Sequence, residues 1–138
     1  MIKIIVIRIT RHAADAARAN ALKSAFGEGV VIVDRDIPYG IDPVAAVTQL
    51  IESVEVESGG KVVAVEAQAP LSVLIRLVQQ RSEIGAKLIR AQFERDATGR
   101  AVVVGKDESG RDLLKFSHYE EFVRIEFEMV PLSVVQPL

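Results

Sequence analysis

Three short apolar runs recur in the first half of the chain, and each is followed by polar residues and then by a helical pattern. The runs cover residues 2–9, 30–33 and 62–65, and β-branched side chains dominate them. Apolar residues at successive positions are typical of strands buried on both faces, as the strands of parallel sheets are. The pattern therefore predicts three parallel strands.

The segments after these runs carry helix signals. Residues 13–26 are rich in alanine, which favours a helix that lies close to a sheet. Asp42 followed by Pro43 predicts a helix start, because aspartate caps the first amides and proline fits the first helical position. Pro70 opens a third helix. Residues 1–84 thus predict a β-α-β-α-β-α order, and we expect an α/β fold, a Rossmann-like three-layer sandwich.

The pattern changes in the second half of the chain. Residues 89–94 alternate between apolar and polar, and residues 101–104 are expected to return after a turn as their antiparallel partner. Residues 123–129 alternate strictly, and residues 118–121 are expected to interrupt the strand before them. Such alternation is typical of half-solvated antiparallel strands.

These boundaries predict one domain over residues 1–138. The parallel half ends at residue 84, antiparallel strands follow over residues 85–130, and residues 131–138 form a short tail. With 49% hydrophobic and 26% charged residues, a chain of this length is long enough to build one core.

Composition excludes several classes of function. The net charge of −2 provides no field that would attract long nucleic acids. The absence of cysteine excludes disulfides, zinc–thiolate sites, iron–sulfur clusters and a cysteine nucleophile. We find no membrane-length apolar run, signal-peptide pattern, dinucleotide fingerprint or P-loop. We therefore expect a cytoplasmic protein with no membrane contact, no metal site and no cofactor.

Thr10, Arg11 and His12 follow the first strand directly and are the strongest candidates for chemistry. Open α/β sheets bind ligands at the carboxyl ends of their strands, where a helix N-terminus offers free amides to an anion. Arg11 can hold a phosphate, Thr10 can donate its hydroxyl, and His12 can act as an acid or base near neutral pH. The alternative is that Thr10 caps the following helix while Arg11 and His12 are solvated.

The end of the second strand supplies another candidate group. Arg35 lies there between Asp34 and Asp36, and Tyr39 lies in the loop that follows. The two acids can bind a metal or a ribose, Arg35 can contact the ligand, and Tyr39 can stack on a base. The alternative is that these residues only form a turn and pack.

The end of the third strand carries Glu66, Gln68 and Ser72, which can contact a base edge or a ribose. The alternative is a tight connection between strand and helix. His118 next to an acidic pair suggests metal or acid–base chemistry, but its place in an expected turn favours a structural or solvated role.

Three short stretches give the chain a resemblance to a known family. They are the first strand running into residues 10–12, the third strand meeting a proline-started helix over residues 65–71, and a strand beginning at residues 85–88. In these features residues 1–95 resemble CARF domains, the CRISPR-associated Rossmann-fold sensors of cyclic oligoadenylate, and especially their small stand-alone relatives.

This resemblance implies a role in CRISPR-associated antiviral defence. It also implies a homodimer that binds a small nucleotide or cyclic oligonucleotide across its two-fold axis. Thr10, Arg11 and His12 would meet phosphate, together with Gln68 and Ser72. Some relatives cleave this ligand without a metal, by attack of a ribose 2′-hydroxyl. Arg11 and His12 would then be catalytic, with Arg11 stabilising charge and His12 acting as an acid.

Two other classes of function stay open from the sequence. One is a small-molecule enzyme acting on a nucleoside or phosphate compound, with Glu66 or Asp36 in acid–base roles. The other is a non-catalytic interaction or assembly protein, in which the alternating C-terminal segment presents one apolar face, made of Val123, Ile125, Phe127 and Met129.

Overall fold

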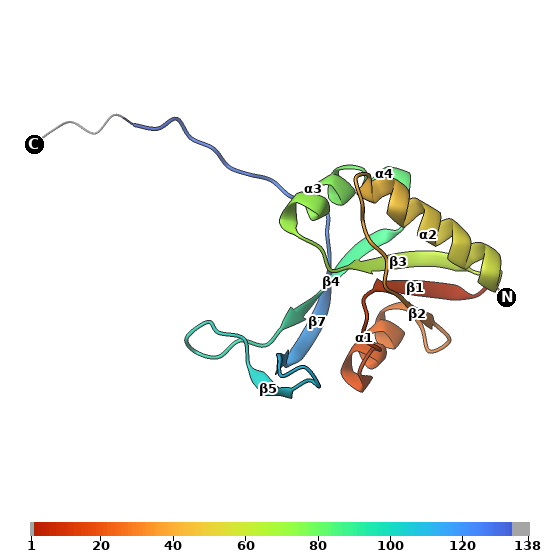
Figure 1. Ribbon diagram of the computed structural model, residues 1–138, viewed down its shortest axis with the longest axis horizontal. Coiled ribbons are helices and arrows are strands. Elements are labelled where there is room, and N and C mark those ends of the chain that lie inside the picture. Colours follow the sequence, from red (N-terminus) through yellow and green to blue (C-terminus); the bar gives the residue numbers. More distant parts are fainter. Residues whose placement is uncertain (1, 134–138) are drawn as a thin grey trace, which may run out of the picture.

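The computed structural model describes residues 2–133 and contains one mixed sheet with helices on both faces. Helix α1 covers one face, and α2, α3 and α4 cover the other (Figure 1). In chain order the elements are β1 (Ile4–Ile9), α1 (Ala16–Phe26), β2 (Val31–Arg35), α2 (Pro43–Ser58), β3 (Lys61–Ala67), α3 (Leu71–Gln79), α4 (Arg81–Ile84), β4 (Lys87–Phe93), β5 (Val103–Lys106), β6 (Asp112–Leu114) and β7 (Phe116–Glu121).

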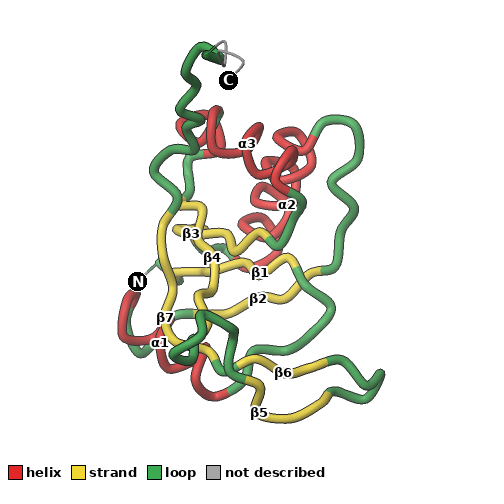
Figure 2. Tube along the Cα trace, turned by 90° about the vertical axis from the view of Figure 1, so that its left-hand side faces the viewer, coloured by secondary structure: helices red, strands yellow, loops and turns green. Residues whose placement is uncertain are grey.

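The main sheet has the strand order β2-β1-β3-β4-β7. Strands β2, β1, β3 and β4 are parallel, and β7 runs antiparallel to β4 at the edge. A separate two-stranded hairpin, β5 with β6, lies on the α1 side of the sheet (Figure 2). The predicted β-α-β-α-β-α order and the Rossmann-like layout are therefore confirmed.

Alternate residues of the central strands fill two separate cores. Ile5 and Ile7 pack with α2 and α3 on one face, whereas Val6 packs with Leu22 of α1 on the other. All four side chains are fully buried. Burial of both faces explains why the first run carries apolar residues at successive positions.

The start of α2 is as predicted, because Oδ1 of Asp42 accepts a hydrogen bond from the amide of Ala45 at 3.1 Å. The start of α1 differs from the expectation of a helix from residue 13. Helix α1 begins at Ala16, because Asp15 caps it by accepting from the amide of Arg18 at 2.8 Å. Thr10 does not cap this helix, and residues 10–15 form a loop.

Strand β4 corrects the predicted boundary between the two halves of the chain. It pairs with β3 in parallel over residues 87–89, so the parallel part continues past residue 84, and from Ile89 to Phe93 the strand pairs antiparallel with β7. Its first half is buried at Leu88 and Ile89, and only its second half has the half-exposed pattern that resembled a hairpin strand.

The expected return after the turn begins as predicted, because Ala101 forms an antiparallel bridge with Arg95 and the amide of Val102 donates to the carbonyl of Glu94 at 2.9 Å. From Val103 onward, however, the chain is β5, which pairs with β6 and not with β4.

Two further expectations for the C-terminal part are wrong. Residues 118–121 do not interrupt a strand, because they form most of β7. Residues 123–129 form no strand, although they alternate. The amide of Phe122 still donates to the carbonyl of Leu88 at 2.8 Å, but β4 starts at Lys87, so the chain then runs past the end of its partner. The tail predicted for residues 131–138 lies outside the described residues from residue 134 onward.

No helix formed within residues 2–133 combines the length and the apolar content needed to span a bilayer.

Candidate functional site at the carboxyl ends of β1 and β3

The strand order reverses between β1 and β3, and this places a candidate site at their carboxyl ends. The connection from β1 leads to β2 through α1 on one face, whereas the connection from β3 leads to β4 through α3 on the other. The two loops therefore diverge and leave an open position between them, where α/β sheets of this kind bind ligands.

A row of charged side chains crosses the sheet directly below this position. Arg8 on β1 is paired in register with Asp34 on β2 and Glu66 on β3. Its Nε lies 3.0 Å from Oε1 of Glu66, and its Nη1 lies 2.9 Å from Oδ1 of Asp34. The Arg8 and Glu66 side chains are 3% and 1% exposed, so both charges are buried and are stabilised by each other.

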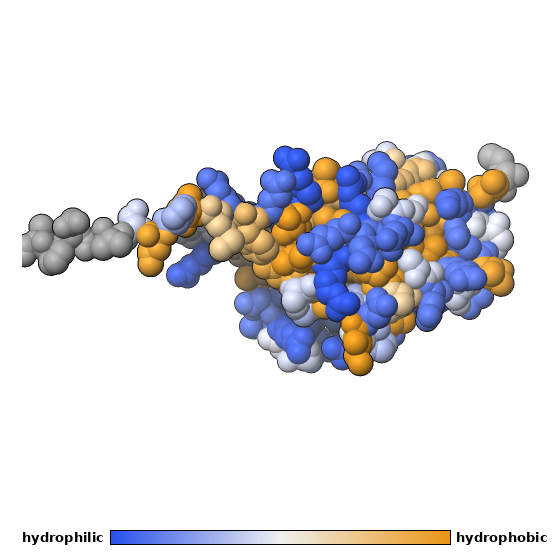
Figure 3. All heavy atoms as spheres, turned by 90° about the horizontal axis from the view of Figure 1, so that it is seen from above, coloured by the Kyte–Doolittle hydropathy of each residue, from blue (hydrophilic) through white to orange (hydrophobic). Residues whose placement is uncertain are grey.

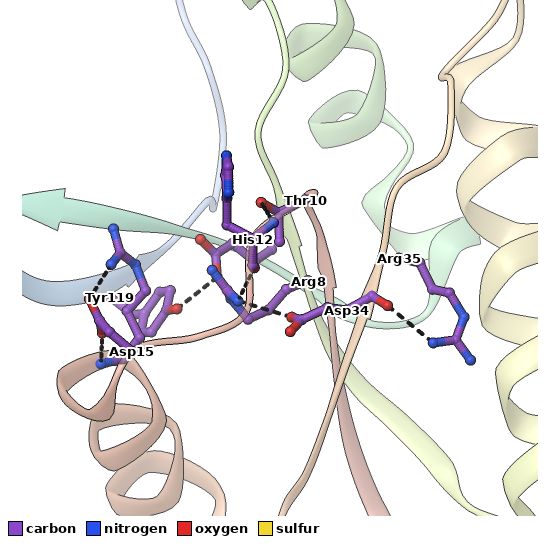
Figure 4. Close-up of polar contacts among 9 residues, drawn as sticks. Arg8, Thr10, His12, Asp15, Asp34, Arg35 and Tyr119 are labelled. Carbon is purple, nitrogen blue, oxygen red and sulfur yellow. Dashed lines mark hydrogen bonds and ion pairs between the residues drawn. The ribbon is translucent and has the colours of Figure 1, made fainter. Parts of the chain in front are cut away.

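Tyr119 extends this row to the edge strand β7. Its hydroxyl donates to Oε1 of Glu66 at 2.7 Å, and this bond is the dashed line that starts at the Tyr119 hydroxyl in Figure 4. Burial raises the pKa of Tyr119, and the hydrogen bond to Glu66 raises it further. Burial lowers the pKa of Arg8 and is the largest single effect, but the charge and hydrogen bond of Glu66, together with Tyr119 and Asp34, outweigh it, so the pKa of Arg8 is raised. Tyr119 is therefore neutral and Arg8 is charged near neutral pH.

The loop that carries Thr10, Arg11 and His12 is held from below by this row. Nη1 of Arg8 donates to the carbonyl of His12 at 3.0 Å (Figure 4). Oγ1 of Thr10 accepts from the amide of His12 at 3.2 Å and closes a turn within the loop. The side chains of Arg11 and His12 are exposed above it. Arg8 thus fixes the loop backbone while leaving two basic side chains free to meet a ligand.

The loop after β2 contacts both the loop after β1 and the loop after β3. Oδ2 of Asp36 lies 3.9 Å from Nε of Arg11, and both side chains are well exposed. The hydroxyl of Tyr39 donates to the carbonyl of Gln68 at 3.4 Å. The structure therefore brings together the three strand ends singled out in the sequence. Burial raises the pKa of Tyr39 to about 12, so this tyrosine is neutral at physiological pH.

Arg35 does not join this group. Its Nη2 lies 3.3 Å from Oε2 of Glu57 on α2, and its Nη1 donates to the carbonyl of Asp34 at 3.1 Å. Figure 4 shows its side chain turned away from His12 and Thr10, toward the α2 side. The structure therefore gives Arg35 a contact with α2 and not a place beside residues 10–12.

The two helix N-termini at this edge differ in what they offer an anion. Asp15 caps α1 and brings its own negative charge, which corrects the expectation of free amides beside Thr10. Helix α3 starts after Pro70 with no side-chain cap. Gln68 precedes this start, Ser72 lies in the first turn, and both are exposed. An anion is therefore better accommodated at α3 than at α1.

A hollow next to the loop adds residues that the sequence did not indicate. Arg11 and His12 line it together with Lys106 and Ser109 of the β5–β6 hairpin. Nζ of Lys106 lies 3.0 Å from Oδ1 of Asp112 and remains well exposed. Asp107 and Glu108 line the hollow too, and Oγ of Ser109 donates to Oδ1 of Asp107 at 2.9 Å. The hollow thus combines basic, acidic and hydroxyl side chains, and its groups suited to a phosphate are those of Arg11 and Lys106. Local periodicity cannot reveal this grouping, because the hairpin lies almost a hundred residues further along the chain.

Arg8, Glu66 and Tyr119 were also missed as one group. A signal was present, because Arg8 interrupts an apolar run and acidic residues end the second and third runs. Only the strand register shows that these charges meet. Glu66 is buried beneath the site and contacts Arg8 and Tyr119. This placement argues against the acid–base role considered for its side chain.

The second histidine lies apart from these groups. His118 is exposed on β7, with Nε2 2.9 Å from Oε1 of Glu120 and Nδ1 2.9 Å from Oγ of Ser117. Over residues 2–133, no three His, Asp or Glu side chains are arranged to hold a metal ion.

Comparisons with protein-family models, with curated proteins and with solved structures gave no match. The fold and the candidate site define an α/β protein of Rossmann-like layout with a basic loop at its topological switch point.

Proposed function

We propose that this protein binds a nucleotide ligand through its phosphates at the carboxyl ends of β1 and β3. The observation that carries the proposal is that the exposed side chains of Arg11 and His12 share one hollow with Lys106, whose lining also includes Asp107, Glu108 and Ser109. Arg11 supplies a bidentate contact to phosphate, and Lys106 supplies a second positive charge. Thr10 in the same loop, and Tyr39, Gln68 and Ser72 at the neighbouring strand ends, would offer polar and aromatic contacts to the rest of the nucleotide.

The resemblance to CARF domains narrows the ligand to a cyclic oligoadenylate and adds a homodimer in the cytoplasm. A cyclic ligand with repeated phosphates needs repeated basic contacts, and two copies of the loop would supply them. In cleavage, the ribose 2′-oxygen would form a bond to phosphorus and lose its proton to water, and the bond from phosphorus to the 5′-oxygen would break. Arg11 would stabilise the charge on the phosphate and His12 would protonate the leaving 5′-oxygen, without a metal. The row beneath the loop supports this chemistry by fixing the backbone of His12.

The test is a binding measurement with Arg11→Ala. Titration calorimetry with mononucleotides and with cyclic oligoadenylates of several ring sizes should give heat with the wild type and none with this variant. Arg81→Ala is the matched control, because Arg81 is an exposed arginine on α4, which packs with α2 and α3 on the opposite face. Unchanged binding by Arg11→Ala would show that Arg11 does not contact the ligand. If the wild type gave no heat with any of these ligands, the proposed ligand class would be contradicted.

Cleavage is tested separately. Incubation with a bound ligand in the presence of a chelator should yield linear products with a 2′,3′-cyclic phosphate if the 2′-hydroxyl attacks. His12→Gln should slow this step while binding persists. If the bound ligand is still intact after long incubation, the protein binds it without cleaving it, and the nuclease activity is excluded.

A further inference from the structure

We propose that residues 122–129 pair with the same segment of a second copy, forming an intermolecular antiparallel strand pair around Ile125. The segment continues β7 directly, beyond the point where β4 can pair with it. Figure 1 shows the chain passing α3 after β7 and then leaving the body of the molecule, and Figure 3 shows apolar and polar residues mixed along the part that leaves.

The first argument is the mismatch between sequence pattern and exposure. Strict alternation is the pattern of a strand with one buried face, yet this segment has no strand partner within residues 2–133. Ile125 is partly buried and packs against the core, but Val123, Phe127 and Met129 on the same alternation are 58%, 66% and 88% exposed. Apolar side chains that alternate along an extended, exposed segment mark a surface for another chain.

The second argument is charge complementarity, which selects the register. A two-fold axis through Ile125 sets each Arg124 opposite Glu126 of the partner subunit. Moving the axis by one residue sets Arg124 against Arg124 or Glu126 against Glu126. Moving it to Phe127 sets Glu126 against the partner's Glu128. Opposite charges across an antiparallel pair are favourable and like charges are unfavourable, so the axis through Ile125 is preferred.

The third argument is a hollow that fits the resulting contact. Leu71, Leu74, Phe122, Val123 and Ile125 contribute its apolar lining, charged residues of β4, β7 and the segment itself line the remainder, and Leu71 is 55% exposed. In the register around Ile125, Val123 stands opposite the partner's Phe127. That phenyl ring therefore reaches the hollow beside Leu71, and the second Phe127 does the same on the other copy. This packing supports the strand pair, because a two-stranded ribbon alone is only marginally stable.

This pairing uses residues 122–129, whereas the homodimer of the proposed function would form around residues 10–12. Cross-linking between positions 123 and 127 tests this pairing, and ligand binding by Arg11→Ala tests the proposed function, so the two failures are distinguishable. The first test is sedimentation of the full chain at high micromolar concentration. The wild type should be a dimer, Phe127→Asp should be a monomer, and Val56→Asp should remain a dimer. Val56 is a suitable control because it is 80% exposed on α2, away from the segment. A monomeric wild type, or a dimer that survives Phe127→Asp, would overturn the proposal.

The second test reads the register, since the chain has no cysteine of its own. Val123→Cys and Phe127→Cys are prepared as separate proteins and oxidised. Each alone should stay uncross-linked, and their mixture should give a disulfide-linked pair. Cross-linking of either variant with itself, or none in the mixture, would contradict an axis through Ile125. Arg124→Glu and Glu126→Arg should each weaken the dimer, and combining both in one chain should restore it.

Discussion

Arg8 on β1 and Glu66 on β3 form a buried ion pair across the two central strands, with Nε and Oε1 3.0 Å apart. Burying two charges is costly unless each has a partner and further hydrogen bonds. Asp34, the carbonyl of His12 and the hydroxyl of Tyr119 supply these bonds. The pair therefore joins β2, β1, β3 and β7 directly under the candidate ligand site.

Arg8→Met should destabilise the protein by about 3–5 kcal/mol, because it leaves the carboxylate of Glu66 buried without its cation. Chemical denaturation measures this change. Arg35→Met is the matched control: its pair with Glu57 is exposed, so a loss of only about 0–1 kcal/mol is expected. Equal losses of unfolding free energy in the two variants would show that the buried pair contributes no more to stability than the exposed pair.

Tyr119→Phe should cost about 1.5–3 kcal/mol, because the hydroxyl donates to a charged acceptor that is buried. The phenyl ring keeps the contact with Phe116, whose centroid lies 5.1 Å from that of Tyr119, so packing is retained. His118→Ala, on the exposed side of the same strand, should change stability by less than about 0.5 kcal/mol. An unchanged free energy of unfolding in Tyr119→Phe would mean that the hydrogen bond to Glu66 does not stabilise the protein.

Both tyrosines should ionise at a higher pH than tyrosine does in the unfolded chain. The pKa of Tyr39 is raised to about 12 by burial, and that of Tyr119 is raised by burial and by Glu66. An unfolded tyrosine titrates near pH ~10, so the fold favours the neutral form. This stabilisation is complete below pH ~10 and is lost as pH rises toward 12.

Tyrosinate absorbance measures this titration cleanly, because the chain has two tyrosines and no tryptophan. Tyr119→Phe leaves only the signal of Tyr39. A midpoint near that of denatured protein in this variant would contradict the burial of Tyr39.

Gly60→Ala should destabilise the protein by about 1–3 kcal/mol, because there is no room for a methyl group. A Cβ built at Gly60 would lie 2.9 Å from the carbonyl oxygen of Lys3 and 2.6 Å from Cδ1 of Ile5. At Gly29 the same atom meets nothing within 4 Å, so Gly29→Ala should be neutral or stabilising by up to about 1 kcal/mol. Thermal unfolding of the two variants side by side checks this contrast.

Local sequence signals sufficed for most of the fold. The parallel strands follow from apolar runs, and the start of α2 follows from Asp42 and Pro43, because both signals act within a few residues. The start of α1 was missed because Asp15 competes as a cap with Thr10, and only the loop path decides between them.

The remaining differences come from non-local pairing. Alternation over residues 123–129 predicts a strand, but a strand also needs a neighbour, and β4 ends before it can supply one. In the same way, the second half of β4 resembles a hairpin strand, although its buried residues pair with β3. The three strand ends singled out in the sequence do contact one another in the structure, whereas Lys106 lies beside Arg11 and His12 only through the path of the hairpin.

The buried pair also constrains the order in which the chain can fold. Arg8 is synthesised early, but Asp34 follows 26 positions later and Glu66 follows 58 positions later. Until β3 is made, the guanidinium has to stay hydrated, and β1 cannot settle into a dry core. A nascent chain that stops before Glu66 should therefore remain open to proteases, and the parallel sheet should form in one late, cooperative step.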